Sequence, residues 1–297
     1  EHNMACELIE RFGTSAQQGR YLTRLASGEL LAAFGLTEPG AGSNASALKT
    51  HASRRGDNFI LNGEKCYITS AGWAGVYLVF ARTLEGSAGK DGISAFLVDD
   101  DCSGLSISPA EKKMGAELSP IASLTFNEAQ VPAGQLLGEL HKGYQIALSG
   151  LARGRIGIAA IANGIASAAI KLAMKHLSER MQFEQRLIEF QGLQFMLADM
   201  QTSLEAAQLL TWQAAHTLES FPKSPLNRRY PSHAKLFATD SAMRITTDAV
   251  QLLGGAGYIK EYGAEKLMRD AKMLQIVEGT NQIQRLVIAR ELEKELL

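Results

Sequence analysis

The sequence has little cysteine, proline or tryptophan, and its charges nearly cancel. Its 297 residues include three cysteines, seven prolines and two tryptophans. Cys6, Cys66 and Cys102 form no CxxC pair and leave one thiol without a mate, which argues against a disulfide scaffold and suits a reducing compartment. The formal net charge of -1 gives no electrostatic reason to expect nucleic acid or an anionic membrane as a partner.

Long hydrophobic runs, targeting signals and metal-ligand spacings are also missing. No stretch approaches ~18 consecutive apolar residues, so we expect no membrane span. The start, Glu1 to Cys6, lacks the basic and apolar regions of a secretory signal. A bacterial cytoplasm and a mitochondrial matrix both fit. The six histidines show no HExxH or similar spacing, so we expect no metal site.

The sequence pattern that indicates secondary structure changes twice along the chain. Residues 3–28 predict helix with a break at Gly13. From 31 to 131 short β-like runs alternate with turn residues, such as Phe59–Leu61 before a turn at Asn62-Gly63. Regularly spaced short strands of this kind favour a small antiparallel sandwich or barrel over βαβ units.

From residue 143 onward the pattern is that of long helices. Apolar stripes predict helices over 145–178, 193–219 and 233–253, and a fourth that follows Glu278. A four-helix bundle is the simplest arrangement for them. The expected class is α+β, with the end of an N-terminal helical domain at 1–30, a middle β-domain at 31–131 and a C-terminal bundle domain at 132–297.

One carboxylate, Glu278, lies between the apolar pair Ile276 and Val277 and the last predicted helix. We expect Asn281 to cap that helix, with Gln284 in the capping-box position. Loss of solvation beside apolar neighbours would raise the pKa of Glu278 toward a value useful for a general base. The alternative is an ordinary solvated acid near a helix N-terminus.

The segment Thr37–Asn44 reads Thr-Glu-Pro-Gly-Ala-Gly-Ser-Asn. Its glycines loosely match a dinucleotide fingerprint, but no βαβ unit surrounds them. Two glycines flanked by hydroxyl groups still permit close backbone approach to a flat or phosphorylated ligand. The alternative is an ordinary loop at the end of a strand.

Three further segments could contact a ligand, and each also has an ordinary structural explanation. Tyr67 and Thr69 share one face of a predicted strand, as core residues often do. Arg180 ends the first long helix, where it could hold a phosphate or only complement the helix dipole. The glycines of Gln251–Gly255 could simply end a helix.

Seven ordered segments together share a pattern with one enzyme family. They are Leu36–Ser43, Tyr67–Thr69, Gly154–Ala160, Arg180–Phe183, Gln251–Gly255, Lys266–Ala271 and Val277–Thr280. With them the chain resembles the acyl-CoA dehydrogenase family over almost its whole length. Its opening, Glu1-His-Asn-Met, is most similar to the isobutyryl-CoA dehydrogenases and other short-branched-chain members.

The resemblance implies an FAD-dependent α,β-dehydrogenation of an acyl-CoA to the trans-2-enoyl-CoA. Glu278 matches the base that removes the α-proton, and its own N–H matches a donor to the thioester oxygen. The matched FAD-binding positions are Phe34, Leu36, Thr37, Gly42, Ser43, Tyr67, Ile68, Thr69, Arg180, Phe183, Phe190, Gln191, Gln251, Gly254, Gly255, Thr280, Asn281 and Gln282. The matched substrate-binding positions are Ser43, Arg153, Gly154, Arg155, Gly279 and Arg290.

The family also implies partners for this chain. Positions such as Arg180 and Phe183 bind the FAD of a neighbouring subunit, so a homotetramer built as a dimer of dimers is implied. An electron-transfer flavoprotein is the implied electron acceptor. An acyl-CoA oxidase of the same fold, and a non-catalytic flavin-binding or DNA-associated relative, are the alternatives.

Two departures from the family pattern are visible, and one neighbouring position, Gly154, bears on where the base lies. Ala152 and Arg153 stand where members commonly carry an acid or amide before Gly-Gly-Arg, so CoA binding could be altered or the acyl carrier could differ. Gly154 occupies the position at which isovaleryl-type members place their base, so the intact Glu278 argues for the standard base. Most of the family's first helical domain has no counterpart before Glu1.

Overall fold

The computed structural model describes residues 1–296, and its internal contacts divide the chain into two units. The first unit comprises residues 1–113 and 117–151, and the second comprises residues 114–116 and the chain from 152 onward. The division predicted from the sequence, 1–30, 31–131 and 132–297, stays a prediction of domain boundaries. By contacts, the first helices and residues 132–151 belong with the sheet.

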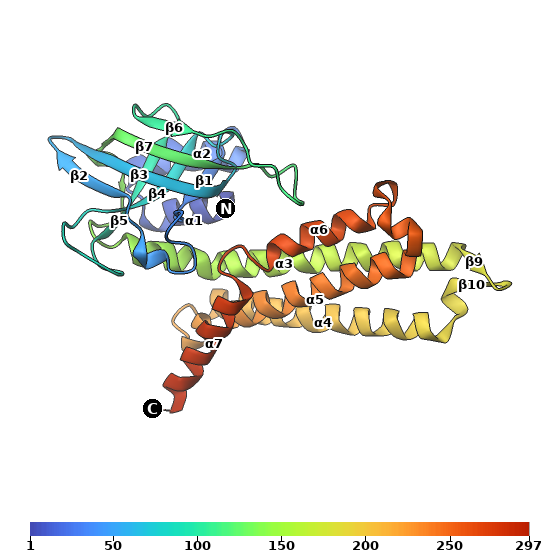
Figure 1. Ribbon diagram of the computed structural model, residues 1–297. Helices are drawn as coiled ribbons and strands as arrows, with labels where there is room; N and C mark the ends of the chain where they lie inside the picture. The colour runs from blue at the N-terminus through green and yellow to red at the C-terminus, as the bar shows by residue number, and fades with distance from the viewer. Residues whose placement is uncertain (297) are drawn as a thin grey trace. The chain divides into compact units, whose positions relative to one another are not determined.

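The first unit is built on an eight-stranded sheet (Figure 1). Its strands are β1 (Ala32–Gly35), β2 (His51–Arg55), β3 (Asn58–Thr69), β4 (Val76–Arg82), β5 (Ile93–Asp99), β6 (Leu105–Ile107), β7 (Ile121–Pro132) and β8 (Leu136–Leu137). Their order is β6-β7-β3-β2-β4-β5-β8, with β1 beside β4. The β1–β4 and β2–β4 pairs are parallel and the other pairs are antiparallel.

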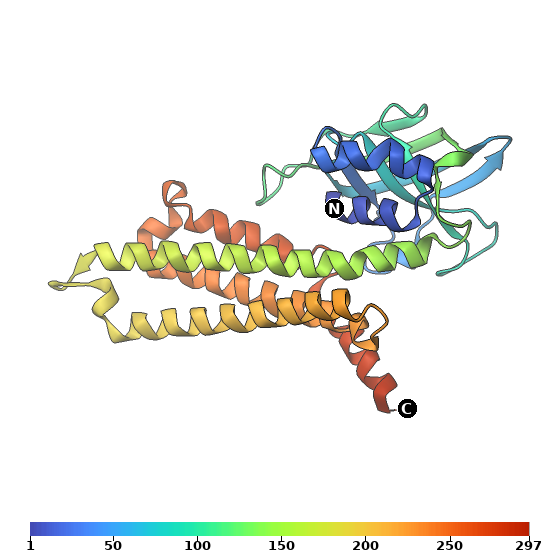
Figure 2. The same cartoon turned by 180° about the vertical axis from the view of Figure 1, so that it is seen from behind.

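The two faces of β4 build two separate apolar cores, because side chains alternate along a strand. Leu78 and Phe80 pack with the helices α1 (His2–Phe12) and α2 (Ser15–Ser27). Figure 2 shows these helices covering one face of the sheet. Tyr77 and Val79 pack in the other cluster, against strands β3 and β7. The predicted α+β class is confirmed.

The predicted turn at Asn62-Gly63 is wrong. Strand β3 runs through both residues, and its register against β7 shifts between Leu61 and Gly63. Gly63 has a φ of 141°, and a β-carbon there would lie 2.7 Å from Cα of Thr50. The glycine therefore marks a close approach between neighbouring chain segments within the sheet.

The second unit is helical. Its elements are α3 (Gly143–Glu179), which enters the unit at Ala152, then the hairpin β9 (Met181–Gln182) and β10 (Gln185–Arg186), α4 (Gln191–Ser220), α5 (Tyr230–Leu253), α6 (Ala264–Leu274) and α7 (Asn281–Leu296). Short 3-10 turns, among them Leu187–Glu189, Pro225–Arg228, Gly254–Tyr258 and Lys260–Tyr262, link these elements.

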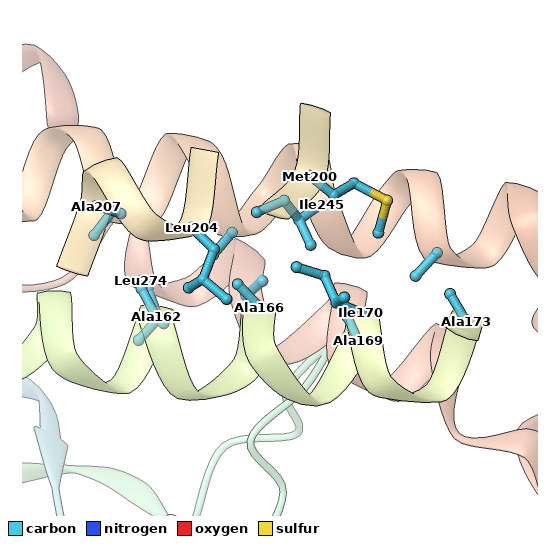
Figure 3. Close-up of a cluster of buried hydrophobic side chains, with 14 of the residues drawn as sticks. Ala162, Ala166, Ala169, Ile170, Ala173, Met200, Leu204, Ala207, Ile245 and Leu274 are labelled. Carbon is cyan, nitrogen blue, oxygen red and sulfur yellow. The ribbon is translucent and has the colours of Figure 1, made fainter. Parts of the chain in front are cut away.

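Small side chains form much of the bundle core (Figure 3). Ala162 and Ala166 of α3 pack with Leu204 of α4, Ile245 of α5 and Leu274 of α6. The predicted four-helix bundle is therefore present, but its fourth helix is α6. Among the described residues α7, which was expected in that place, contributes nothing to this apolar cluster, because its buried side chains are polar.

Helix α3 is long and apolar enough, by length and composition, to cross a membrane. The sequence expectation of no spanning segment did not anticipate this. Ala159, Ala169 and Ala173 of the same helix are buried in the bundle core. Packing against α4, α5 and α6 therefore accounts for part of the apolar character of this helix.

Candidate active site

Glu278 lies in the tight turn between α6 and α7. Its φ is +57° and that of Gly279 is +85°, so two successive residues adopt the left-handed conformation. Such a conformation is uncommon for a residue with a side chain and is often found at functional sites. The hydroxyl of Thr280 accepts the N–H of Ile283 at 3.3 Å and so caps α7. The predicted cap at Asn281 is wrong, because the preceding threonine takes that role.

Two buried side chains hold the backbone of this turn. Nζ of Lys235, in α5, donates to the carbonyl of Gly279 at 3.0 Å and to Oδ1 of Asn281 at 2.7 Å. Nε2 of Gln284, in α7, donates to the same Gly279 carbonyl at 2.7 Å and to that of Glu278 at 3.2 Å. Lys235 and Gln284 have no exposed surface. The turn is therefore fixed from two helices.

The side chain of Asn281 extends this network to α5. Its Nδ2 donates to Oδ1 of Asp240 at 2.6 Å and to the hydroxyl of Thr239 at 2.9 Å. Asp240 also accepts Gln275 at 2.7 Å and pairs with Arg285 at 2.9 Å. The two ends of the turn, at 275 and 281, are thus tied to the same carboxylate.

The carboxyl group of Glu278 is poised to exchange a proton. Its Oε2 is buried, and within residues 1–296 it has no hydrogen-bond partner. Burial raises the pKa of Glu278 to about 7, and the positive charges of Arg155 and Lys235 oppose that rise. Nor does the N–H of Glu278 donate a hydrogen bond within this part of the chain. Glu278 therefore combines a carboxyl group whose pKa is about 7 with a backbone N–H that is available to a ligand.

Gly154 and Arg155, on α3, lie next to this carboxyl group. A β-carbon on Gly154 would lie 2.6 Å from Cδ of Glu278, so only glycine leaves room for it. Arg155 is half-buried, its NH1 donates to the hydroxyl of Ser232 at 3.3 Å, and its Nε has no partner in the described chain. Burial lowers the pKa of Arg155, and the charge of Glu278 opposes that effect.

In the first unit a backbone hydrogen bond links the chain at Thr37 to the chain next to Tyr67. The N–H of Cys66 donates to the carbonyl of Thr37 at 2.9 Å. Tyr67 has a φ of +57° and is 67% exposed, although its neighbours Cys66 and Ile68 are buried. Thr69 follows at the end of β3. An exposed aromatic ring and a hydroxyl therefore lie along one short stretch.

A buried ion pair supports this stretch. Nζ of Lys65 lies 2.8 Å from Oε1 of Glu38 and 3.2 Å from the carbonyl of Leu36. Glu38 also accepts the N–H groups of Lys49 at 2.6 Å and Thr50 at 2.9 Å. Neither charged side chain is exposed. The pair fixes the backbone on either side of Thr37.

A cavity of about 580 Å³ in the second unit brings Arg180 together with Gly255. His176, Ala256 and Tyr262 also line it. Gly254 and Gly255 are exposed and carry no side chain over their backbone. A guanidinium beside bare backbone suits a phosphate group.

Two predicted aromatic residues meet near the β9–β10 hairpin, one in its turn and one immediately before α4. Phe183 is 85% exposed and has a φ of +50°. Its ring meets that of Phe190 edge to face, with centroids 6.2 Å apart. Gln191 and Gln251, two further predicted FAD-binding positions of this unit, are exposed.

The other predicted positions are buried, lie on an exposed loop, or lie apart from the Glu278 carboxyl group. Phe34, Leu36 and Ile68 are buried in apolar clusters, so only their backbone can meet a ligand. Gly42 and Ser43 lie on an exposed loop of the first unit. The remaining predicted residues of the second unit are dispersed around the turn: Arg153 pairs with Glu219 at 3.6 Å, while Gln282 and Arg290 are exposed on α7.

Lys235 and Lys65 were not identified from the sequence. Lys235 precedes Thr239, Ala242 and Thr246 at helical spacing, and all four are fully buried. A lone lysine on an otherwise small-residue face is a detectable signal, but its hydrogen-bond partners lie 44 and 46 residues further along the chain. Among the described residues no three His, Cys, Asp or Glu side chains are grouped as a metal site.

Comparison with known proteins gives consistent matches. Residues 33–129 match the acyl-CoA dehydrogenase middle domain and residues 141–293 the acyl-CoA dehydrogenase C-terminal domain. The chain is 42% identical over 294 residues to the mitochondrial isobutyryl-CoA dehydrogenase of Dictyostelium discoideum, covering 99% of this chain and 70% of that protein.

Two solved structures share both fold and sequence with this chain. The butyryl-CoA dehydrogenase of Megasphaera elsdenii has a TM-score of 0.94 and 43% identity, covering 98% of this chain and 75% of that one. A chain from a structure described as the electron transferring flavoprotein of Acidaminococcus fermentans has a TM-score of 0.93 and 46% identity, covering 97% of this chain and 74% of that one.

Proposed function

The chain belongs to the acyl-CoA dehydrogenase family, and we propose that it oxidises a short or branched-chain acyl-CoA to the trans-2-enoyl-CoA with Glu278 as the base. The observation that carries the assignment of the base is the Glu278 carboxyl group. It is buried beside Gly154, its Oε2 is unpaired within the described residues, and its pKa is about 7.

Removal of the α-proton is the part of the reaction that this chain's own residues perform. The α-proton of a thioester is too weakly acidic for a carboxylate in water, so the site must stabilise the developing enolate. The N–H of Glu278 is available as one donor to the thioester oxygen. Arg155 adds positive charge near the same carboxyl group.

The raised pKa of Glu278 meets two requirements of a general base. A base with a pKa near 7 is substantially ionised at neutral pH and still strong enough to take a proton. Because Lys235 and Gln284 fix the turn, the carboxylate needs little reorganisation before it reacts. Burial also excludes water that would compete for the proton.

The residues present fit FAD, which supplies the acceptor for the hydride that leaves the β-carbon. Tyr67, with its exposed ring, and the hydroxyls of Thr37 and Thr69 suit contacts to a flat, polar ring system. Arg180 and the bare backbone at Gly255 suit a phosphate. The FAD contacts of Thr280, Asn281 and Gln282 stay predictions. Of these three, only Gln282 has an exposed side chain.

We propose the same partners that the family implies. The exposed Phe183, Met181 and Tyr258 near the Arg180 cavity form apolar surface that a neighbouring subunit would cover, in support of a homotetramer. The match to a chain in an electron-transferring-flavoprotein structure supports such a flavoprotein as the electron acceptor. Relatives include a mitochondrial protein and bacterial proteins, so we infer a mitochondrial matrix or a bacterial cytoplasm.

An anaerobic titration of the FAD-loaded protein tests this function. We expect isobutyryl-CoA or butyryl-CoA to bleach the flavin absorbance and octanoyl-CoA to do so poorly. Bleaching by none of the three would contradict the proposed substrate class. Turnover with oxygen alone, at the rate seen with an electron-transfer flavoprotein, would instead identify an oxidase.

A further inference from the structure

We propose that Lys235 is a positioning residue for the base: its buried ammonium group fixes the Glu278 turn and keeps the Glu278 carboxylate ionised at neutral pH. This inference rests on the proposed function of Glu278. It adds a residue, from a different helix, that controls how strong a base Glu278 is and where it is held.

The contacts of Lys235 show what it does to the backbone. Its ammonium lies 3.0 Å from the Gly279 carbonyl and 2.7 Å from Oδ1 of Asn281, and it makes no ion pair with Glu278. It therefore acts on the residue after the base and not on the carboxylate directly. The two bonds bridge the second left-handed residue of the turn and the first residue of α7.

The position of this charge is unusual enough to need an explanation. Burying a lysine costs free energy, and burial accordingly lowers the pKa of Lys235 to about 8. A glutamine or methionine of similar length would avoid most of that cost. The same carbonyl already accepts Gln284, so holding the backbone does not by itself require a cation. What the cation adds is a positive charge close to Glu278.

The charges around Glu278 come from three helices. Arg155 belongs to α3, Lys235 and Asp240 to α5, and Arg285 to α7. Asp240 is neutralised by Arg285 at 2.9 Å and is bound by Asn281. Within the second unit, Arg155 and Lys235 are the cations that oppose the effect of burial on the pKa of Glu278. If either cation is removed, less positive charge counteracts the effect of burial on the pKa of Glu278. The carboxyl group then keeps its proton to a higher pH.

The step concerned can be observed without any oxidation. Acetyl-CoA has α-hydrogens but no β-carbon, so it can lose a proton to the base but no hydride. In D2O the α C–H bond breaks, the proton goes to the Glu278 carboxylate, and a deuteron returns to carbon. The loss of the acetyl methyl signal in proton NMR reports this exchange as a function of pH.

The test compares variants of the FAD-loaded chain of 297 residues. In Lys235→Met and Lys235→Gln we expect the pH midpoint of exchange to rise by about one unit, which is roughly a tenfold slower exchange at pH 6. Lys235→Gln keeps a hydrogen-bond donor, so it serves if the methionine variant fails to fold. Thr239→Val loses a bond to Asn281 but keeps the charge, and should leave the midpoint in place.

Matched controls separate this inference from the function on which it rests. Lys175→Met removes an exposed lysine of α3 and should leave the profile unchanged. Exchange that persists in Glu278→Gln would overturn the proposed base, whatever Lys235 does. If Glu278→Gln abolishes exchange but both Lys235 variants keep the wild-type midpoint, or Thr239→Val shifts it equally, the role of Lys235 is wrong.

Discussion

Gly154 of α3 lies against the carboxylate of Glu278 so closely that a β-carbon at position 154 would stand 2.6 Å from Cδ of the glutamate. Two side chains cannot share that space. A carboxylate at 154 and one at 278 are therefore alternatives, and this chain has the glycine where the other arrangement would place a base. The proposed location of the base therefore depends on a steric relationship between two residues 124 positions apart.

Gly154→Ala should displace the carboxylate and slow flavin reduction by roughly a hundredfold, since small misplacements of catalytic groups are costly. Its fold should survive, because alanine favours a helix over glycine by about 1 kcal/mol. Gly157→Ala and Gly164→Ala are matched controls on the same helix, where an added β-carbon meets nothing within 4 Å. Single-turnover absorbance measures the rate. Equal rates in all three variants would refute the steric account.

Glu278→Gln should make the protein more stable at pH 8 and not at pH 4.5. The folded-state pKa of about 7 lies above the ordinary 4.5, so the folded form holds a proton that the unfolded form has released. Stability is therefore lost as pH rises from 4.5 to 7. At about 1.4 kcal/mol per unit the cost is on the order of 3 kcal/mol above pH 7.

Urea unfolding at the two pH values measures that cost. The stability difference between Glu278→Gln and the wild type should grow across this interval and level off above pH 7. A difference that is the same at pH 4.5 and pH 8 would show that burial does not raise the pKa of Glu278.

Lys65→Met should destabilise the first unit by about 3–5 kcal/mol, because it leaves Glu38 buried without its cation. The double variant Glu38→Gln with Lys65→Met should recover part of the loss, since no buried charge remains. Guanidinium unfolding gives the free energy of unfolding of each single variant and of the double variant, which together with the wild type form a double-mutant cycle. A double variant less stable than the single one would mean that Glu38 is stabilised mainly by the N–H groups of Lys49 and Thr50.

Arg180→Ala should weaken FAD retention and leave the unfolding temperature nearly unchanged. Arg180 is exposed beside the bare backbone of Gly255, where its loss removes a phosphate contact and no core packing. The ratio of flavin to protein absorbance after gel filtration measures retention. Arg186→Ala, which removes an exposed arginine of the adjacent β9–β10 hairpin, is the control. Equal flavin content in both variants would count against the Arg180 site.

Local sequence patterns were enough to place Glu278 on a turn before a helix, but not to predict the residues that surround it. Apolar neighbours and a helix start placed Glu278 on a turn, as observed. The cap was assigned to Asn281 because asparagine favours that position, yet Thr280, which is also a common cap, stands one residue earlier and takes the role. Asn281 is instead drawn into contact with Lys235 and Asp240, which no local pattern predicts.

The fold shows the same limit. The lengths of α3, α4 and α5 follow from apolar stripes and were predicted within a few residues. Helix α6 was overlooked as the fourth member of the bundle because it is only 11 residues long and carries several charges. Gly63 signals a turn in most sequences, but here it serves a close approach to Thr50. Such features depend on tertiary contacts and not on neighbours in sequence.

The most direct test of the central claim is anaerobic single-turnover reduction of Glu278→Gln by the acyl-CoA that bleaches the wild type best. The account predicts that the variant retains FAD and that its flavin absorbance does not fall within the time in which the wild type is fully reduced. Reduction at the wild-type rate would contradict the assignment of Glu278 as the base.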